Sequence, residues 1–258
     1  MRKSVFDMPG AIASLVAVAL AAVVSLPVQA YDTRFGDRLA ARAAPAGASA
    51  WDVSMASRLR LVSAQSSATL LPGETALAAG VEITLDPKWK TYWRTPGDTG
   101  IAPMFDFSRS TNVASVDVAY PMPQRFDLPG DISFGYEDRV VFPLAVTPQI
   151  PGAPVVLVAD VIYGACEELC IPVEANAQLA LASAPTATTP FADDIARWRA
   201  RVPATRGAIL VRVQPVTDDE GARLHVDVDA STPWASPTMI AELVEGPARA
   251  YLGTPIHQ

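Results

Sequence analysis

The sequence predicts an all-β protein built on an antiparallel β-sandwich. From Trp51 onward, short segments rich in Val, Ile, Thr and aromatic residues are separated by turns that contain Pro and Gly, such as LPGE, TPGDTG and IPGAP. Several segments alternate apolar and polar residues, as in VEITL and VDVAY, which is the period of a half-buried strand. The 23 prolines suit a loop-rich β domain, since turns offer proline many positions.

This strand pattern recurs through residues 51–186, which we assign to the sandwich domain. Short strands with turn signals between them are typical of such a fold. The expected strands span residues 58–64, 79–85, 91–94, 113–120, 140–147, 155–163 and 177–181.

One helix is expected in residues 187–204, where it would link the sandwich to the rest of the chain. Thr189 can cap the helix. Phe191, Ile195 and Trp198 recur at i, i+4 and i+7, which gives the helix one apolar face. Acidic residues precede basic residues along the segment, in the order that the helix dipole favours.

Residues 205–258 predict a second β unit. Strands are expected at 208–214 and 223–229, with the DDEG stretch between them as a solvated hairpin turn. The unit is about half the size of an immunoglobulin-like sandwich, which takes about 100 residues. We therefore expect either a small appendage or a domain that the sequence truncates.

The N-terminus predicts export. Residues 1–30 combine a basic start, an apolar run over 11–26 and small residues for cleavage near Ala30, the pattern of a signal peptide. The apolar run is shorter than the roughly 20 residues of a membrane span, and no second long run follows. Residues 31–50 are rich in Ala, Arg and Gly and predict a flexible leader. We expect no membrane span after signal cleavage.

Charge and motifs restrict the partners. The net charge of −7 argues against nucleic acid, whose binding depends on Lys and Arg, and against an anionic membrane surface. The sequence has no P-loop, HExxH or GxSxG pattern. We therefore expect no nucleic-acid partner and no cofactor.

The only two cysteines, Cys166 and Cys170, lie in the stretch YGACEELCIPVEA. A structural disulfide stabilises most when it closes a long loop, so a pair this close favours chemistry over scaffolding. A tight turn brings such residues within the roughly 7 Å between Cα atoms that a disulfide needs, and disulfides strained by a short loop are easier to reduce. Glu167 and Glu168 disfavour a thiolate, so any activating group would come from elsewhere in the fold.

Thiol–disulfide exchange is the interpretation that this pair favours, and two alternatives stay open. One is a buried, inert disulfide. The other is a copper or zinc site that adds His225 or His257 to the two thiolates, since Cu(I) prefers sulfur and zinc takes four ligands.

Trp89, Tyr92 and Trp93 form the densest aromatic cluster. A platform for binding sugars is one interpretation. Packing in the core and along a half-exposed edge is favoured, because aromatic residues are common in strands.

Several stretches are shared with a known family. They are RLRLVSA at 58–64, residues 81–126 with the specific WKTYWRTPGD segment, FGYEDRVVFPLAV at 134–146, YGACEELCIPVEA at 163–175 and, weakly, PWASPTMIAELVEGP at 233–247. On these residues the chain resembles the N-terminal periplasmic domain of the DsbD family of thiol:disulfide interchange proteins. The subgroup that it most resembles is the suppressor-of-copper-sensitivity B proteins, linked to copper tolerance.

The resemblance implies an immunoglobulin-like sandwich with one redox-active disulfide, which Cys166 and Cys170 match. Cys170 would join a partner in a mixed disulfide and Cys166 would resolve it. The family covers its pair with an aromatic cap loop, and Phe134 and Tyr136 fall in the matching region.

The resemblance also implies a periplasmic protein-disulfide reductase component. Electrons would arrive from a membrane electron transporter or its thioredoxin-like domain and pass to oxidised periplasmic proteins. Because the sequence contains neither of those donor domains, we expect the donor to act in trans, either on a stand-alone protein or on a truncated product.

Overall fold

The computed structural model describes residues 44–70, 73–97, 100–128, 131–182, 187–203, 210–218 and 221–229. The expected signal peptide, most of the expected leader and the end of the second β unit lie outside these residues. In the described residues, no helix is both long enough and apolar enough to cross a membrane.

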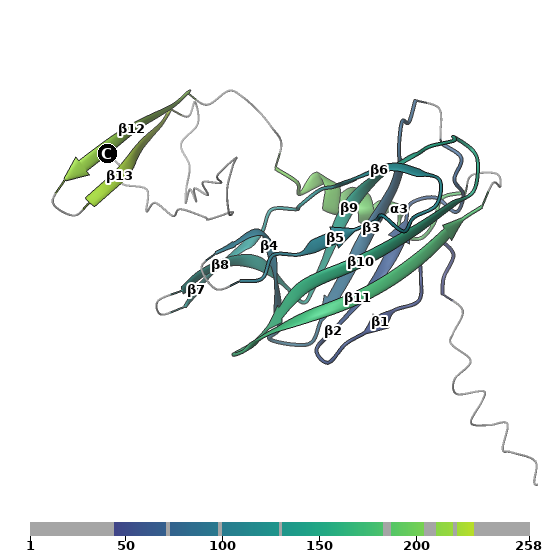
Figure 1. Ribbon diagram of the computed structural model, residues 1–258, viewed down its shortest axis with the longest axis horizontal. Helices are drawn as coiled ribbons and strands as arrows, with labels where there is room; N and C mark the ends of the chain where they lie inside the picture. The colour runs from purple at the N-terminus through teal and green to yellow at the C-terminus, as the bar shows by residue number, and fades with distance from the viewer. Residues whose placement is uncertain are drawn as a thin grey trace, which may run out of the picture. The chain divides into compact units, whose positions relative to one another are not determined.

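Two antiparallel sheets form a β-sandwich (Figure 1). The first sheet has the order β1-β2-β3-β9-β6. Its strands are β1 (Asp52–Val53), β2 (Ser57–Ser63), β3 (Leu77–Leu85), β9 (Arg139–Pro148) and β6 (Val113–Val118). The fold class expected from the sequence is thereby confirmed.

The second sheet has the order β11-β10-β4-β8-β7, and a short strand, β5, pairs with β10. Its strands are β11 (Cys170–Leu181), β10 (Val155–Cys166), β4 (Lys90–Gly97), β8 (Asp131–Glu137), β7 (Gln124–Leu128) and β5 (Met104–Asp106). This sheet carries both cysteines.

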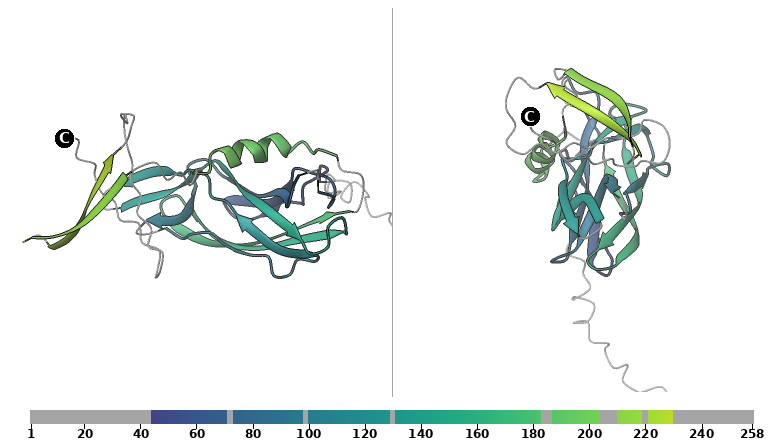
Figure 2. Two further views of the ribbon diagram at one scale, coloured as in Figure 1. Left: turned by 90° about the horizontal axis from the view of Figure 1, so that it is seen from above. Right: turned by 90° about the vertical axis from the view of Figure 1, so that its left-hand side faces the viewer.

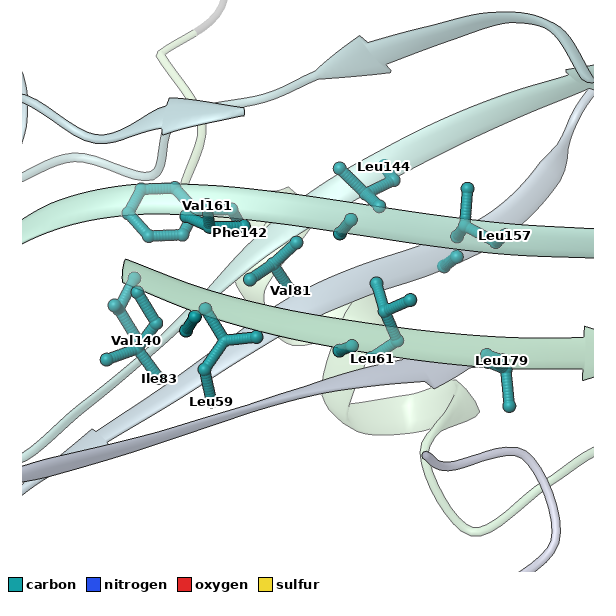
Figure 3. Packing of buried hydrophobic residues seen from close by; sticks show 14 of the residues in the cluster. Leu59, Leu61, Val81, Ile83, Val140, Phe142, Leu144, Leu157, Val161 and Leu179 are labelled. Carbon is teal, nitrogen blue, oxygen red and sulfur yellow. The ribbon is translucent and has the colours of Figure 1, made fainter. Parts of the chain in front are cut away.

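The core lies between the facing sides of the two sheets (Figure 3). Alternate residues of each strand point inward, because side chains along a strand alternate between its two faces. Burying each large aliphatic or aromatic side chain contributes about 1.5–3 kcal/mol to stability. The buried residues that Figure 3 labels are Leu59, Leu61, Val81, Ile83, Val140, Phe142, Leu144, Leu157, Val161 and Leu179.

Helix α3 (Ala192–Ala200) packs on the outer face of the first sheet (Figure 2). Its Ile195 is buried in a small cluster with Val62, Val141 and Ala48. The segment was expected to be helical, and its apolar face accounts for this packing. Ala48 lies at the end of the expected leader, where it bridges to Val62.

An ion-pair network also joins the helix to the sheet. Glu82 is buried and accepts hydrogen bonds from Arg60 and Arg139, each at 2.6 Å. Arg139 also donates to Asp194 on α3, and Arg197 donates to Asp194 at 3.0 Å. Thr189 does not occupy the N-cap position, which is Phe191, but its hydroxyl accepts a hydrogen bond from the Phe191 amide at 3.1 Å.

Strands β12 (Leu210–Asp218) and β13 (Gly221–Asp229) pair with each other in an antiparallel hairpin. Asp218 lies opposite Gly221, which places the turn at the DDEG stretch. The hairpin expected in the second β unit is therefore present.

All seven strands expected in the sandwich are present, and the described residues contain four further strands that were missed. β1 and β5 are two and three residues long, too short to give a sequence pattern. β7 and β8 pair as a hairpin; QRFDL is mostly polar, whereas DISFGYE alternates apolar residues with Ser and Gly, a strand pattern that was overlooked. The missed hairpin lies directly beside β4.

We predict that Asp194→Asn destabilises the fold at neutral pH by about 1 kcal/mol, the scale of a partly buried ion pair. Burial by itself raises the pKa of Asp194, but the hydrogen bonds and charges of Arg139 and Arg197 outweigh burial and hold it below the ordinary value. The contribution is therefore complete above the ordinary Asp pKa of about 3.9 and is lost as pH falls through the lower folded-state pKa.

Urea unfolding at pH 7 and pH 3 measures this difference. Asp193→Asn is the matched control, because Asp193 is an exposed residue in the same helical turn. An equal loss of stability in both variants at pH 7, or an Asp194 effect that is undiminished at pH 3, would contradict the prediction.

Candidate functional site

The disulfide closes the end of the longest hairpin. Strands β10 and β11 are each 12 residues long and pair from Val155 opposite Leu181 to Cys166 opposite Cys170. The two cysteine Cα atoms are 4.1 Å apart and the sulfurs are bonded. Directly opposed residues of an antiparallel pair are the neighbours that a disulfide can join. The stretch expected at a strand end is therefore the tip of a hairpin.

The two cysteines differ in access. Cys166 is only 1% exposed, whereas Cys170 is an exposed residue. The turn between them is exposed as well, and Leu169 at its tip is 79% exposed. A partner can therefore reach Cys170 and the turn, while Cys166 lies behind them.

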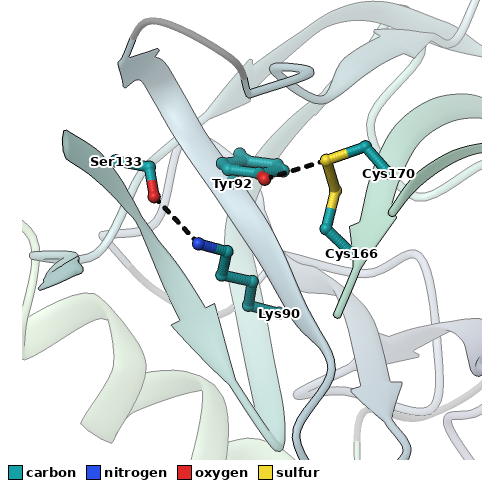
Figure 4. Close-up of a disulfide and its surroundings, with 5 residues drawn as sticks. All are labelled: Lys90, Tyr92, Ser133, Cys166 and Cys170. Atoms are coloured by element: carbon teal, nitrogen blue, oxygen red, sulfur yellow. Dashed lines mark hydrogen bonds between the residues drawn. A yellow bond between two sulfur atoms is a disulfide. The ribbon is translucent and has the colours of Figure 1, made fainter. Parts of the chain in front are cut away.

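Strand β4 brings a tyrosine to the disulfide. Tyr92 is buried, and its hydroxyl oxygen lies 3.1 Å from the Cys170 sulfur (Figure 4). A phenol can donate a hydrogen bond to sulfur, and a hydrogen bond to the charged form of an acid stabilises that form. When the disulfide opens, the Tyr92 hydroxyl is placed to stabilise a Cys170 thiolate.

Glycines make room for the Tyr92 ring on the outer face of the second sheet. A Cβ added to Gly164 would lie 3.2 Å from ring carbons of Tyr92 and 2.9 Å from the Cβ of Ile101. A Cβ added to Gly100 would lie 2.5 Å from a ring carbon of Tyr92. The ring is therefore held closely by backbone that no larger residue could supply without a shift.

Lys90 places a positive charge on the outer face of the same sheet. It pairs in register with Cys166 on β10 and with Glu137 on β8, so its side chain emerges on the same outer face. Lys90 is 8% exposed, and its Nζ donates a hydrogen bond to the Ser133 hydroxyl at 3.0 Å (Figure 4). The sequence signal for both residues was the WKTYW alternation, in which Lys90 and Tyr92 share one face.

The aromatic cluster divides between the two faces of β4. Trp93 lies in the sandwich core and Trp89 packs partly against it, as expected. Tyr92, between them, faces outward but is buried. The cluster was correctly interpreted as structural packing for the tryptophans, and the role of Tyr92 beside the disulfide was missed.

Phe134 and Tyr136, which the resemblance placed in a cap loop, lie on β8 as buried members of the core. The Tyr136 hydroxyl donates to the Pro121 carbonyl oxygen at 2.7 Å, and the ring packs edge-on against Phe142. Between them, Gly135 lies opposite Tyr92. For these two side chains the structure shows burial between the sheets rather than cover over the disulfide.

Metal ligands do not cluster in the part of the chain that the structure describes, where no group of three His, Cys, Asp or Glu is placed to hold an ion. His225 lies on β13, and His257 lies outside the described residues.

Residues 60–182 match the family model for "Thiol:disulfide interchange protein DsbD, N-terminal". The matched region is 123 of the chain's 258 residues. It includes both cysteines together with Lys90, Tyr92 and Gly164, so the candidate site lies wholly within the match to the DsbD N-terminal model. The family expected from the sequence motifs is confirmed.

A solved structure is also similar to this chain. The N-terminal periplasmic domain of ScsB from Proteus mirabilis matches with a TM-score of 0.56 and 21% sequence identity, over 79% of this chain and 81% of that one. The match shows that the two share a fold. Among curated proteins, no sequence matches the chain significantly.

We predict that Tyr92→Phe raises the pKa of the Cys170 thiol by roughly 0.5–1 unit, because it removes a hydrogen bond to the thiolate but keeps the ring. The rate of alkylation by iodoacetamide against pH, in a Cys166→Ala background with one thiol, measures this pKa. Tyr120→Phe is the control, since Tyr120 packs against Phe105 and Phe142 and not against the disulfide. Equal titrations of the Tyr92→Phe and parent proteins would refute the role assigned to the hydroxyl.

Proposed function

We propose that the chain is a periplasmic thiol–disulfide exchange protein. It takes reducing equivalents from a membrane electron transporter or a thioredoxin-like domain acting in trans, and passes them to oxidised periplasmic proteins. The observation that carries the proposal is the asymmetric pair itself, an exposed Cys170 bonded to a buried Cys166 with the Tyr92 hydroxyl at the exposed sulfur. The match of residues 60–182 to the DsbD N-terminal model supports it.

The reaction begins with both thiols reduced. The Cys170 thiolate attacks one sulfur of the partner's disulfide, so the partner's S–S bond breaks, a Cys170–partner bond forms and one partner thiolate leaves. The Cys166 thiol loses its proton and attacks the Cys170 sulfur. The Cys166–Cys170 bond then closes, the second partner thiolate leaves, and two electrons have passed to the partner.

Access supports these roles. An attacking thiolate must approach the partner's disulfide, which an exposed residue at a hairpin tip can do. A resolving thiol must reach only its neighbour, and Cys166 lies directly opposite Cys170. Burial of Cys166 also keeps partners from attacking the wrong sulfur.

The same pair can run in the opposite direction to be recharged. A donor dithiol attacks the exposed Cys170 sulfur of the oxidised pair, Cys166 leaves as a thiolate, and the second donor thiol releases Cys170. The domain is then a protein-disulfide reductase component rather than a reductase complete in itself, because its electrons come from a separate donor dithiol.

We predict that the disulfide equilibrates with glutathione buffers at a midpoint of roughly −270 to −120 mV, the range of exchange proteins. Alkylation of free thiols followed by mass spectrometry gives the reduced fraction at each ratio of glutathione to glutathione disulfide. Structural disulfides typically lie below about −300 mV. A bond that stays oxidised throughout would assign the pair to structural stabilisation.

We also predict that Cys166→Ser and Cys170→Ser behave differently in a trapping experiment. Cys166→Ser should accumulate a mixed disulfide through Cys170, because the resolving thiol is absent. Cys170→Ser should accumulate little, because its remaining thiol is buried. Mass spectrometry after incubation with an oxidised dithiol peptide distinguishes the species, and trapping through Cys166 would reverse the assigned roles.

A further inference from the structure

Lys90, a buried cation paired in register with Cys166, has no anionic partner among the described residues. Lys90 Nζ donates to the Ser133 hydroxyl at 3.0 Å and lies 4.8 Å from the centroid of the Phe126 ring and 5.7 Å from that of Tyr92. Among the described residues no carboxylate forms a salt bridge with it. Lys90 is only 8% exposed, and removing its charge from water costs free energy unless an opposite charge or hydrogen bonds compensate.

Ser133 and the two rings compensate part of that cost. A hydroxyl supplies one acceptor, and ring faces attract a cation by about 0.5–2 kcal/mol. A role in joining β4 to β7 and β8 needs no charge, however, because an amide or an apolar side chain could join the same strands. The positive charge of Lys90 therefore points to an anion that is absent while the disulfide is closed.

Opening the disulfide creates that anion. The Tyr92 ring lies between the two groups, with Lys90 Nζ on one side and the Cys170 sulfur at its hydroxyl (Figure 4). A nearby positive charge makes a phenol hydroxyl a stronger donor, and buried charges are screened by water less than exposed ones. Lys90 is thus joined to Ser133 by a hydrogen bond and lies near the Tyr92 ring, whose hydroxyl contacts the Cys170 sulfur.

Four carboxylates around Cys170 disfavour its thiolate, which is the opposite of the effect of Lys90. Glu167 and Glu168 lie in the turn, Glu174 lies further along β11, and Glu137 lies beyond Lys90 on β8. All four are exposed, so water and salt screen their repulsion of a thiolate. Of the two cations on β4, Lys90 is buried on this face, whereas Arg94 is exposed and its guanidinium lies over the rings of Trp93 and Tyr120.

We propose that Lys90 is a positioning residue whose charge, acting through the Tyr92 hydroxyl, stabilises the Cys170 thiolate. The proposal rests on the exchange function proposed above and assigns a source for the activation that the turn carboxylates oppose. Lys90 does not touch the partner. It sets the fraction of Cys170 that is present as the thiolate.

Titration of a single thiol tests the proposal without any partner. In the Cys166→Ala background, the thiolate absorbance of Cys170 at about 240 nm is followed against pH. Lys90→Gln, which removes the charge but can still donate to Ser133, should raise the pKa by roughly 0.5–1 unit, a three- to tenfold loss of thiolate below both midpoints. Lys90→Arg, which keeps the charge, should leave it within about 0.3 unit.

A double variant tests whether the effect passes through the tyrosine. In the Tyr92→Phe background, Lys90→Gln should shift the pKa by less than half of its effect in the parent. An undiminished shift would overturn the route through Tyr92.

Three results would overturn the role of the charge. They are an unchanged pKa in Lys90→Gln, equal shifts in the Gln and Arg variants, and loss of folding in both Lys90→Gln and Lys90→Met, which would make the residue structural. Failure of the exchange function would instead appear in the glutathione titration, which does not depend on this measurement.

Discussion

The pairing of β10 with β11 on one side and β4 on the other is the constraint on which the site depends. The first pairing places Cys166 opposite Cys170, and the second places Lys90 opposite Cys166. Because the register along a sheet fixes which side chains share a face, all of these groups emerge together on the outer face. A slip of one residue in either pairing would turn a reactive group into the core.

β4 has buried side chains on both faces of the sheet. Its Thr91 and Trp93 are buried, with Trp93 in the core, while Lys90 and Tyr92 face outward and are buried there as well. The strand is therefore fixed from both sides, and the Tyr92 hydroxyl is carried by a strand whose position packing determines. Rigid support of this kind is what a group must have to keep contact with a sulfur that changes its bonding.

The sequence was sufficient for the sandwich, for α3 and for the importance of Cys166 and Cys170, because these depend on local patterns of apolar residues, turns and spacing. It was insufficient to predict that Tyr92 and Lys90 lie on the same face as the disulfide. Alternation shows that WKTYW has two faces, but both faces bury an aromatic residue, so the pattern cannot tell which one meets the core. The register between β4 and β10 joins residues far apart in the chain, and no local signal encodes it. Phe134 and Tyr136 were assigned from similarity alone, although the alternation of apolar residues in DISFGYE places both on one face of a strand and so indicates their burial.

The position of the cysteines on strands explains why side chains must do the activation. Where a reactive dithiol lies at the start of a helix, the helix dipole and its free amides lower the thiol pKa. Strand dipoles largely cancel in an antiparallel sheet, so the backbone of β10 and β11 offers no such field. The turn between the cysteines adds two carboxylates that oppose a thiolate. In the proposal above, β4 supplies both the hydroxyl donor and the positive charge that the backbone of the hairpin does not offer a Cys170 thiolate.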